Sequence, residues 1–193
     1  MPTALPSHYS PEEYLALEAS SNTKHEYING EIYAMAGASD AHVTVALNIA
    51  AALKAHLRGG PCRVFISDMA LQVQASNAYF YPDVFVSCQP EDRGPAKTDA
   101  TLVVEVLSPS TAAFDRGAKF SHYRHLPSLR ELLLIDPQER TADLYRKGSD
   151  GLWVLHPTSA TAPEADIELA SLGLRLPMAV VLEDVAPSAA SGC

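Results

Sequence analysis

The chain has 193 residues, of which 47% are hydrophobic, and this is enough apolar material for the core of one globular domain. Its formal net charge of -9 excludes binding to nucleic acid by bulk electrostatics alone, because phosphate neutralisation requires clustered Lys and Arg. No stretch approaches the roughly 18 apolar residues of a membrane span, and the N-terminus lacks the pattern of a signal peptide. We therefore expect one cytoplasmic domain over residues 1–185 with no membrane partner, followed by a small, polar, disordered tail over residues 186–193.

The three cysteines are Cys62, Cys88 and Cys193. Their number is odd, their positions are scattered, and no Cys-x-x-Cys pair suggests a zinc or redox centre. The sequence therefore predicts reduced thiols.

Two elements are predicted in the first 35 residues. A helix begins after Ser10, which can cap it, has Pro11 at its first position and extends to about Glu18. The dipeptide Asn29-Gly30, flanked by β-prone residues, favours a type I′ loop of two residues. We expect a short antiparallel hairpin around this loop.

A longer helix is predicted between Asp40, its expected N-cap, and Gly59, just past its end. Its signal is the helical spacing of five apolar residues: Val43, Leu47, Ala50, Leu53 and Leu57.

Strand patterns dominate the rest of the chain. Alternating apolar residues between Cys62 and Cys88 predict several strands, and three more are expected near residues 131–135, 141–145 and 152–155. Residues 102–107 are apolar on both faces apart from one carboxylate, which is typical of a central strand covered on both sides. A helix over about residues 112–125 should follow it and cross over to the next strand. The fold class is therefore α/β or α+β, with a mixed sheet flanked by helices and an N-terminal hairpin.

The carboxylate in the central strand is Glu105. Burying a charged carboxylate costs free energy unless it is paired, hydrogen-bonded or bound to a metal ion. Asp83 begins a nearby strand after Pro82, and 22 residues separate it from Glu105. If the two strands lie side by side, both acids can bind one hard cation such as Mg²⁺ or Mn²⁺.

Lys119 lies about two turns into the following predicted helix, with Asp115 and Tyr123 one turn to either side on the same face. An ammonium group beside a metal site can orient a hydroxide nucleophile and stabilise charge that develops on a phosphoryl group.

The motifs Pro82-Asp83, Leu102-Val-Val-Glu105-Val-Leu-Ser-Pro-Ser110, Asp115 to Lys119 and Tyr123 resemble the PD-(D/E)XK nuclease superfamily, in particular the Uma family of restriction endonucleases. Residues 26–32 and 133–137 resemble that family too, so the likeness covers roughly residues 10 to 157. It implies a restriction-endonuclease-like fold and metal-dependent cleavage of phosphodiester bonds, with DNA as the expected substrate. Asp83 and Glu105 would be the metal ligands. The superfamily lysine expected two residues after the glutamate is Leu107 here, and Lys119 resembles its migrated replacement.

Further site residues are less strongly indicated. Glu31 follows the hairpin turn and should lie on the same face as Glu26, so one of them can complete the metal shell. We include Glu31 among the catalytic candidates, against the alternative that both are exposed strand residues. His42 near a helix start can contact substrate phosphate, although a surface or core histidine is the commoner case. A homodimer is expected by analogy, because two strands require two sites.

Alternative interpretations remain open at this point. Glu105 can form a structural buried pair with Arg116 or Lys119, and Lys119 can be an ordinary solvated lysine. At the level of function, the alternatives are a non-catalytic binding or regulatory module with a nuclease fold, and a metal-dependent hydrolase of a small phosphorylated substrate. A basic groove would favour a polymeric substrate, whereas a small closed pocket would favour the small one.

Overall fold

The computed structural model describes residues 8–35, 37–89, 94–162 and 164–186, so most of the predicted tail lies outside it. The α-helices are α1 (Pro11–Ser20), α2 (Asp40–His56), α3 (Ala112–Phe114), α4 (Phe120–Tyr123) and α5 (Met178–Val181), with a π-helix, η2 (Asp115–Lys119), between α3 and α4. Short 3₁₀ turns are η1 (Gln74–Ser76) and η3 (Ala170–Leu172). Within these ranges, none of the helices has the length and apolar character needed to span a bilayer.

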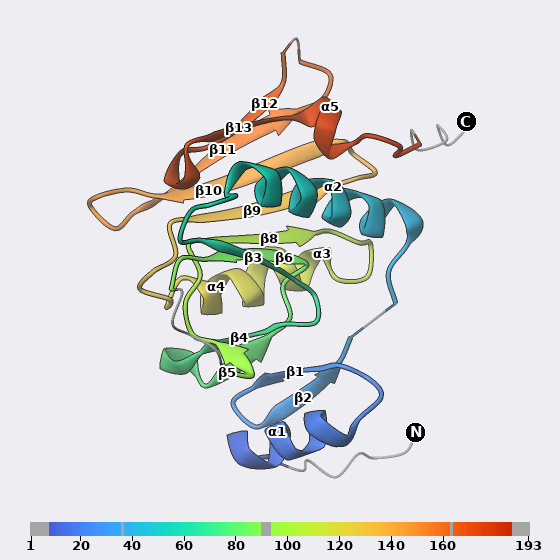
Figure 1. Cartoon of the computed structure of the whole chain (residues 1–193). Helices are drawn as coiled ribbons and strands as arrows, with labels where there is room; N and C mark the ends of the chain where they lie inside the picture. Colours follow the sequence, from blue (N-terminus) through green and yellow to red (C-terminus); the bar gives the residue numbers. More distant parts are fainter. Residues whose placement is uncertain (1–7, 36, 90–93, 163, 187–193) are drawn as a thin grey trace.

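Strands form two larger sheets and one small one (Figure 1). The six-stranded sheet has the order β11 (Trp153–Ser159), β10 (Thr141–Lys147), β9 (Glu131–Asp136), β8 (Leu102–Val106), β6 (Val84–Ser87), β3 (Arg63–Ile66). The five-stranded sheet has the order β2 (Glu31–Ala34), β1 (His25–Ile28), β5 (Ala78–Phe80), β4 (Ala70–Val73), β7 (Ala96–Lys97). Strands β12 (Asp166–Leu169) and β13 (Leu174–Pro177) pair with each other.

Strands β8 and β9 are parallel, and the segment α3–η2–α4 connects them. This confirms the predicted strand-helix-strand crossover, because a parallel pair needs such a connection. The other pairs in the six-stranded sheet are antiparallel. The predicted class, a mixed sheet flanked by helices with an N-terminal hairpin, is confirmed.

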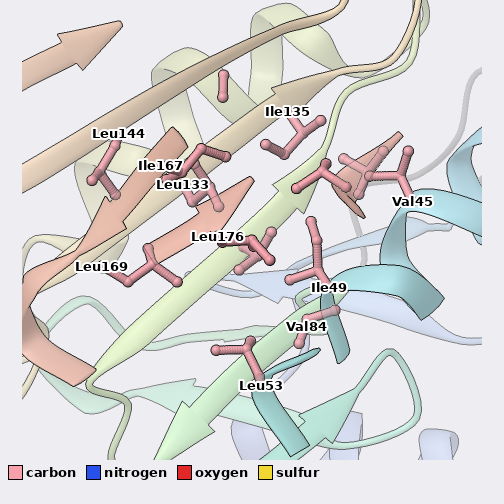
Figure 2. Packing of buried hydrophobic residues seen from close by; sticks show 14 of the residues in the cluster. Val45, Ile49, Leu53, Val84, Leu133, Ile135, Leu144, Ile167, Leu169 and Leu176 are labelled. Carbon is pink, nitrogen blue, oxygen red and sulfur yellow. The ribbon is translucent and has the colours of Figure 1, made fainter. Parts of the chain in front are cut away.

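The central strands β6, β8 and β9 of the six-stranded sheet are covered on both faces, and all five residues of β8 are buried. On one face, α2 and the β12–β13 pair pack onto it through residues such as Ile49, Leu133 and Leu176 (Figure 2). On the other, α4 and strands β4 and β5 contribute to a second cluster that includes Phe85 and Tyr123. Covering on both sides explains why the sequence of β8 is apolar at alternate and intervening positions alike.

Helix α2 differs from the prediction in its cap and in its buried face. Ser39, not Asp40, is the N-cap, and its hydroxyl oxygen accepts a hydrogen bond from the backbone N–H of His42 at 3.3 Å. The residues buried against the sheet are Val45, Ile49 and Leu53, whereas Val43 and Leu47 are 55% and 65% exposed. Both faces of the helix carry apolar residues, so periodicity alone did not reveal which one the sheet covers.

The predicted hairpin is present. Asn29 and Gly30 have φ angles of 49° and 99°, and Ile28 pairs with Glu31, as a two-residue type I′ loop requires. Strand β1 pairs with β5 on its other side, so it lies inside the sheet, while β2 is an edge strand.

The helix after β8 is shorter and less regular than predicted. It ends at Tyr123 instead of about His125, and residues 115–119 form a π-helical turn. Gly117 lies in the middle of this turn, where it weakens regular α-helix. π-Turns within helices occur frequently at functional sites, and both ends of this one, Asp115 and Lys119, are buried polar residues.

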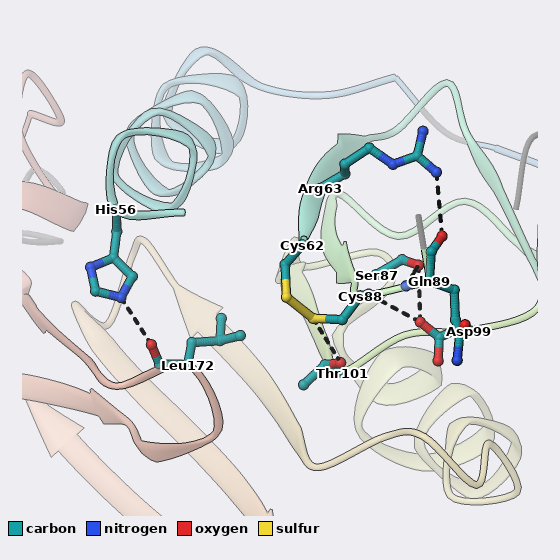
Figure 3. Close-up of a disulfide and its surroundings, with 9 residues drawn as sticks. All are labelled: His56, Cys62, Arg63, Ser87, Cys88, Gln89, Asp99, Thr101 and Leu172. Atoms are coloured by element: carbon teal, nitrogen blue, oxygen red, sulfur yellow. Dashed lines mark hydrogen bonds between the residues drawn. A yellow bond between two sulfur atoms is a disulfide. The ribbon is translucent and has the colours of Figure 1, made fainter. Parts of the chain in front are cut away.

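Cys62 and Cys88 form a disulfide with an S–S distance of 2.04 Å, so the prediction of reduced thiols is wrong for this pair (Figure 3). The two residues flank β3 and β6, whose register pairs Arg63 with Ser87, and this places the cysteines opposite each other. The 26 residues that separate them in sequence hid this proximity. Cys193 lies outside the described residues.

Candidate active site

The pairing of β6 with β8 brings the two predicted metal ligands together. Val84 pairs with Val104, so the next position along the antiparallel register sets Asp83 opposite Glu105 on the same face of the sheet. Asp83 Oδ2 also accepts a hydrogen bond from the backbone N–H of Val106 at 2.7 Å. The two acids therefore lie at one end of two neighbouring strands.

Glu105 is only 3% exposed. Its Oε1 accepts a hydrogen bond from the Tyr123 hydroxyl at 2.6 Å and lies 3.4 Å from Lys119 Nζ. Burial raises the pKa of Glu105 well above its usual value, and the neighbouring charge of Lys119 offsets only part of this effect. A carboxyl group in this state gains a great deal from a further positive charge.

Lys119 is 7% exposed and lies among three carboxylates. Its Nζ is 2.8 Å from Glu26 Oε1, 3.2 Å from Asp115 Oδ1 and 3.4 Å from Glu105 Oε1. Burial by itself lowers the pKa of Lys119, but the three carboxylates outweigh it and raise the pKa above the usual value. The side chain is thus a buried, charged ammonium group, and the alternative of a solvated surface lysine does not hold.

Arg116, the other cation considered for Glu105, is directed elsewhere, because it forms an ion pair with Asp143 on β10. The cation beside Glu105 is therefore Lys119.

Of the two hairpin glutamates, the structure brings Glu26 to the cluster and not Glu31. Glu26 is 6% exposed, and burial raises its pKa while Lys119 opposes that shift. Glu31 is exposed, and its carboxylate accepts a hydrogen bond from Tyr33. The physical reason is strand position: β1 is an inner strand of its sheet, whereas β2 is at the edge.

His42 is a site residue that sequence analysis had ranked low. Its Nε2 lies 2.9 Å from Asp83 Oδ1, and this hydrogen bond raises the pKa of His42 although partial burial lowers it. The residue lies in the first turn of α2, 41 positions before Asp83. Its only sequence signal was a histidine near a helix start. Asp115 and Tyr123 had a better signal, because they lie four residues before and four residues after Lys119, at helical spacing.

Four carboxylates and one ammonium group form the floor of a cleft of about 680 Å³, and we call them the Glu105 cluster: Glu26, Asp83, Glu105, Asp115 and Lys119. Its walls include exposed apolar side chains from α2 and β3, among them Val43, Leu47 and Ile66, together with Phe114. The cleft thus combines an acidic floor with an apolar wall. Its volume is ample for a nucleotide-sized group.

The donor set fits a hard divalent cation. Glu26, Asp83, Glu105 and Asp115 are carboxylates lining one cleft, and oxygen donors of this kind are what Mg²⁺ and Mn²⁺ prefer. Among the described residues, no three Asp, Glu, His or Cys side chains already stand in the arrangement of a metal site. Lys119 lies among three of these carboxylates, 2.8 Å from Glu26, 3.2 Å from Asp115 and 3.4 Å from Glu105, and Asp83 and Glu105 would hold the cation beside it.

Comparison with known proteins assigns the chain to a family. Residues 11–179 match the Uma2 family, whose description is "Putative restriction endonuclease". The chain belongs to the Uma2 family. This confirms the resemblance found in the sequence. Its span also exceeds the roughly 150 residues over which that resemblance was visible.

Two proteins similar to this chain come from Synechocystis sp. strain PCC 6803. The protein slr1290 is 41% identical over 179 residues, which cover 92% of this chain and 93% of that protein. The protein sll1609 is 38% identical over 160 residues, with coverage of 81% and 89%. A crystal structure described as that of a putative nuclease belonging to DUF820 from Anabaena variabilis superposes with a TM-score of 0.74 at 18% identity, covering 88% of this chain and 95% of the other. At that identity the match supports the fold of the Uma2 chain and nothing finer.

Proposed function

We propose that this Uma2 protein is a metal-dependent endonuclease that hydrolyses phosphodiester bonds in DNA. Asp83 and Glu105 would hold Mg²⁺ or Mn²⁺, and Lys119 would act beside them. One observation carries the proposal: a fully buried glutamate lies opposite a second acid on the neighbouring strand and 3.4 Å from a buried ammonium group. Apolar packing at these positions would stabilise the fold as well as the buried charges do. The charges therefore indicate a function other than stability.

Each side chain of the cluster has a distinct part in this proposal. When bound, the cation supplies Lewis-acid activation of a phosphoryl oxygen and lowers the pKa of a coordinated water. Lys119 holds positive charge near the phosphoryl group, where negative charge develops. Tyr123 fixes the orientation of Glu105 through its 2.6 Å hydrogen bond.

The other residues orient Asp83 and balance Lys119. The backbone N–H of Val106 and the ring of His42 each bond one oxygen of Asp83, so its carboxylate has little freedom to rotate. Glu26 and Asp115 keep Lys119 charged and hold its Nζ within 3.2 Å of both carboxylates. Glu26 thereby takes the place for which the sequence analysis had included Glu31 among the catalytic candidates.

The test is cleavage of supercoiled plasmid by the purified protein with Mg²⁺ or Mn²⁺, beside a chelator control. We expect nicked and linear products from the wild type and none from Asp83→Asn or Glu105→Gln. Glu168→Gln is the matched control, since it neutralises a glutamate whose side chain is 60% exposed and remote from the cleft lining. Equal cleavage by Glu105→Gln and the wild type would refute the proposal.

The expected homodimer and cytoplasmic location stay predictions. Sedimentation equilibrium measures the first directly. The disulfide bears on the second, because disulfides are rare in reducing compartments. Thiol titration of protein alkylated at the moment of cell lysis would show whether Cys62 and Cys88 are paired where the protein resides.

A further inference from the structure

Helix α2 carries a solvent-facing stripe that its packing does not explain. The exposed residues Val43, Leu47 and Lys54, with the half-buried Ala50, follow one another at intervals of three or four residues, so they share one side of the helix. Arg58 comes four residues after Lys54, just beyond the end of the helix at His56. The side that packs on the sheet is a different one. Exposed valine and leucine on an otherwise well-packed helix indicate a binding surface when they adjoin a site.

This stripe connects two hollows. Val43, Leu47 and Ala50 line the catalytic cleft, whereas Lys54 and Arg58 line a second pocket of about 430 Å³. Lys54 lies seven residues beyond Leu47, about 10 Å along the helix axis. The surface thus changes from apolar to cationic over roughly the length of one or two nucleotides.

Strand β3, which lies alongside helix α2, also changes from an apolar to a cationic side chain along its length. Ile66 at its end is 54% exposed and lines the catalytic cleft, while Arg63 at its start lines the second pocket. Helix and strand pack against each other, so the two hollows lie along a common track. We call this the α2–β3 track, defined by Val43, Leu47, Ile66, Lys54 and Arg58.

The charges of the cleft disfavour an intact duplex as its occupant. Among the described residues that line it, four are carboxylic acids and only Lys119 and His42 can be cationic, and both are paired with acids. Duplex DNA presents its phosphates outward and keeps the faces of its bases stacked inside, so an apolar wall could reach only base edges and thymine methyl groups. An unpaired strand, in contrast, can lay its bases against apolar side chains and its phosphates against cations.

We propose that the α2–β3 track binds an unpaired strand of nucleic acid and delivers it to the catalytic cluster. Bases lie against Val43, Leu47 and Ile66, and the phosphates that leave the cleft meet Lys54 and Arg58. The cleavage part of this inference rests on the proposed nuclease function, but the binding part does not. A strand of this kind needs one active site, so cleavage would not require a dimer.

The test measures binding of a fluorescein-labelled single-stranded DNA of 20 nucleotides by fluorescence anisotropy, and of the same sequence closed into a blunt hairpin duplex. Ca²⁺ replaces Mg²⁺, and a gel verifies that the probes stay intact. We expect tighter binding of the single strand by on the order of tenfold. Because each released counterion contributes a slope of about 0.7 for single strands, Lys54→Ala/Arg58→Ala should lower the slope of log affinity against log salt by about 1.4.

Leu47→Ser probes the apolar wall, and we expect it to weaken single-strand binding on the order of fivefold, the scale of one lost base contact. The matched control is Leu152→Ser, because Leu152 is 66% exposed and Leu47 is 65% exposed. For the cationic end the control is Arg130→Ala/Arg175→Ala, which removes the same charge from exposed positions outside both pockets. Both controls should bind as the wild type does.

The outcomes separate this inference from the proposed function. Single-strand binding that depends on Leu47 and Lys54, without any cleavage in Mg²⁺, would support the track and contradict the nuclease. Plasmid cleavage with equal affinity for both probes, or with no effect of Leu47→Ser, would support the nuclease and overturn the track. Failure to bind either probe would overturn it too, as would a Leu47→Ser variant that changes only the oligomeric state seen by sedimentation.

Discussion

Two buried glutamates on neighbouring strands have opposite surroundings. Glu131 on β9 is 0% exposed, and its two oxygens accept four hydrogen bonds in all. The donors are Arg146 Nε at 2.7 Å, the backbone N–H groups of Ala170 and Ser171, and the Ser171 hydroxyl. Glu105 on β8 has one full hydrogen bond and one ammonium group that it shares with two other carboxylates.

The two acids differ in how completely their carboxylate oxygens are hydrogen-bonded, and this difference indicates different roles. Glu131 ties the 3₁₀ turn at residues 170–172 to the sheet, and because its bonds are complete it gains nothing from a ligand. Glu105 is left with a pKa raised by burial, which is the usual condition of a group that acts on something else. The side chains of Glu131 and Glu105 are almost equally buried, so their exposed fractions do not distinguish them.

The largest effect should come from removing the structural acid. Glu131→Ala leaves the Arg146 guanidinium and two backbone N–H groups without their acceptor, so it should lower the free energy of unfolding by about 3–5 kcal/mol. Glu105→Gln removes a charge that burial disfavours, and its stability in chelator should equal or exceed that of the wild type. Urea unfolding followed by circular dichroism measures both. Similar losses in the two variants would remove the basis for this comparison.

Lys119→Ala should slow plasmid cleavage by about 10² or more, the scale of one lost preorganised electrostatic contact. Because Lys119 is buried among acids, this variant should also be less stable than the wild type in chelator, and Mg²⁺ should restore part of the loss. Lys119→Arg should recover little cleavage, since a planar guanidinium does not fit where a compact ammonium lies. Wild-type cleavage rates for Lys119→Ala would exclude a role for this lysine.

Divalent cations should stabilise the wild type through the Glu105 cluster alone. At a Mg²⁺ or Mn²⁺ concentration 100 times the dissociation constant, the gain is about 2.7 kcal/mol, which is measurable as a rise in melting temperature. Asp83→Ala should lose this rise, whereas Glu168→Gln, a change at an exposed acid, should retain it. A rise of equal size in all three proteins would point to a cation site elsewhere.

The smallest effect concerns the pair of His42 and Asp83. Hydrogen bonding to Asp83 raises the pKa of His42, so the stabilisation from this pair is fully present below the unfolded value of about 6.5. It disappears as the pH rises through the folded-state pKa. The loss of unfolding free energy in His42→Asn should therefore be larger at about pH 5.5 than at about pH 8.5, on the order of 1 kcal/mol. A loss that does not vary with pH would mean that folding leaves the pKa of His42 unchanged, contrary to this prediction.

The predicted site residues that the structure brings close together share a physical basis in short-range order. Asp83 and Glu105 come from neighbouring antiparallel strands, β6 and β8, whose connection contains only the short strand β7, and Lys119 follows in the next helical segment. The hairpin at Asn29-Gly30 is equally local, because positive φ angles in two successive residues restrict which residues can occupy them.

The predictions that were wrong concern features that depend on packing between segments far apart in the sequence. Spacing marked α2 as a helix, but the apolar residues on two sides left open which side the sheet would cover. The choice of Glu26 over Glu31 depended on β5 pairing with β1. The π-helical turn at residues 115–119 ends at Lys119, which contacts Glu26 and Glu105 on two different sheets, and the helical spacing did not indicate these contacts.

The sequence by itself determined the fold class and the family, and it predicted that Asp83, Glu105 and Lys119 lie together, because these features depend on local patterning and on motifs that lie close together in the chain. Only the tertiary structure decided the disulfide, the hydrogen bond of His42 with Asp83 and the ion pair of Lys119 with Glu26. Each of these joins segments 26 to 93 residues apart. Contacts over such separations form only when the sheets fix which strands are neighbours, and no local pattern specifies that order.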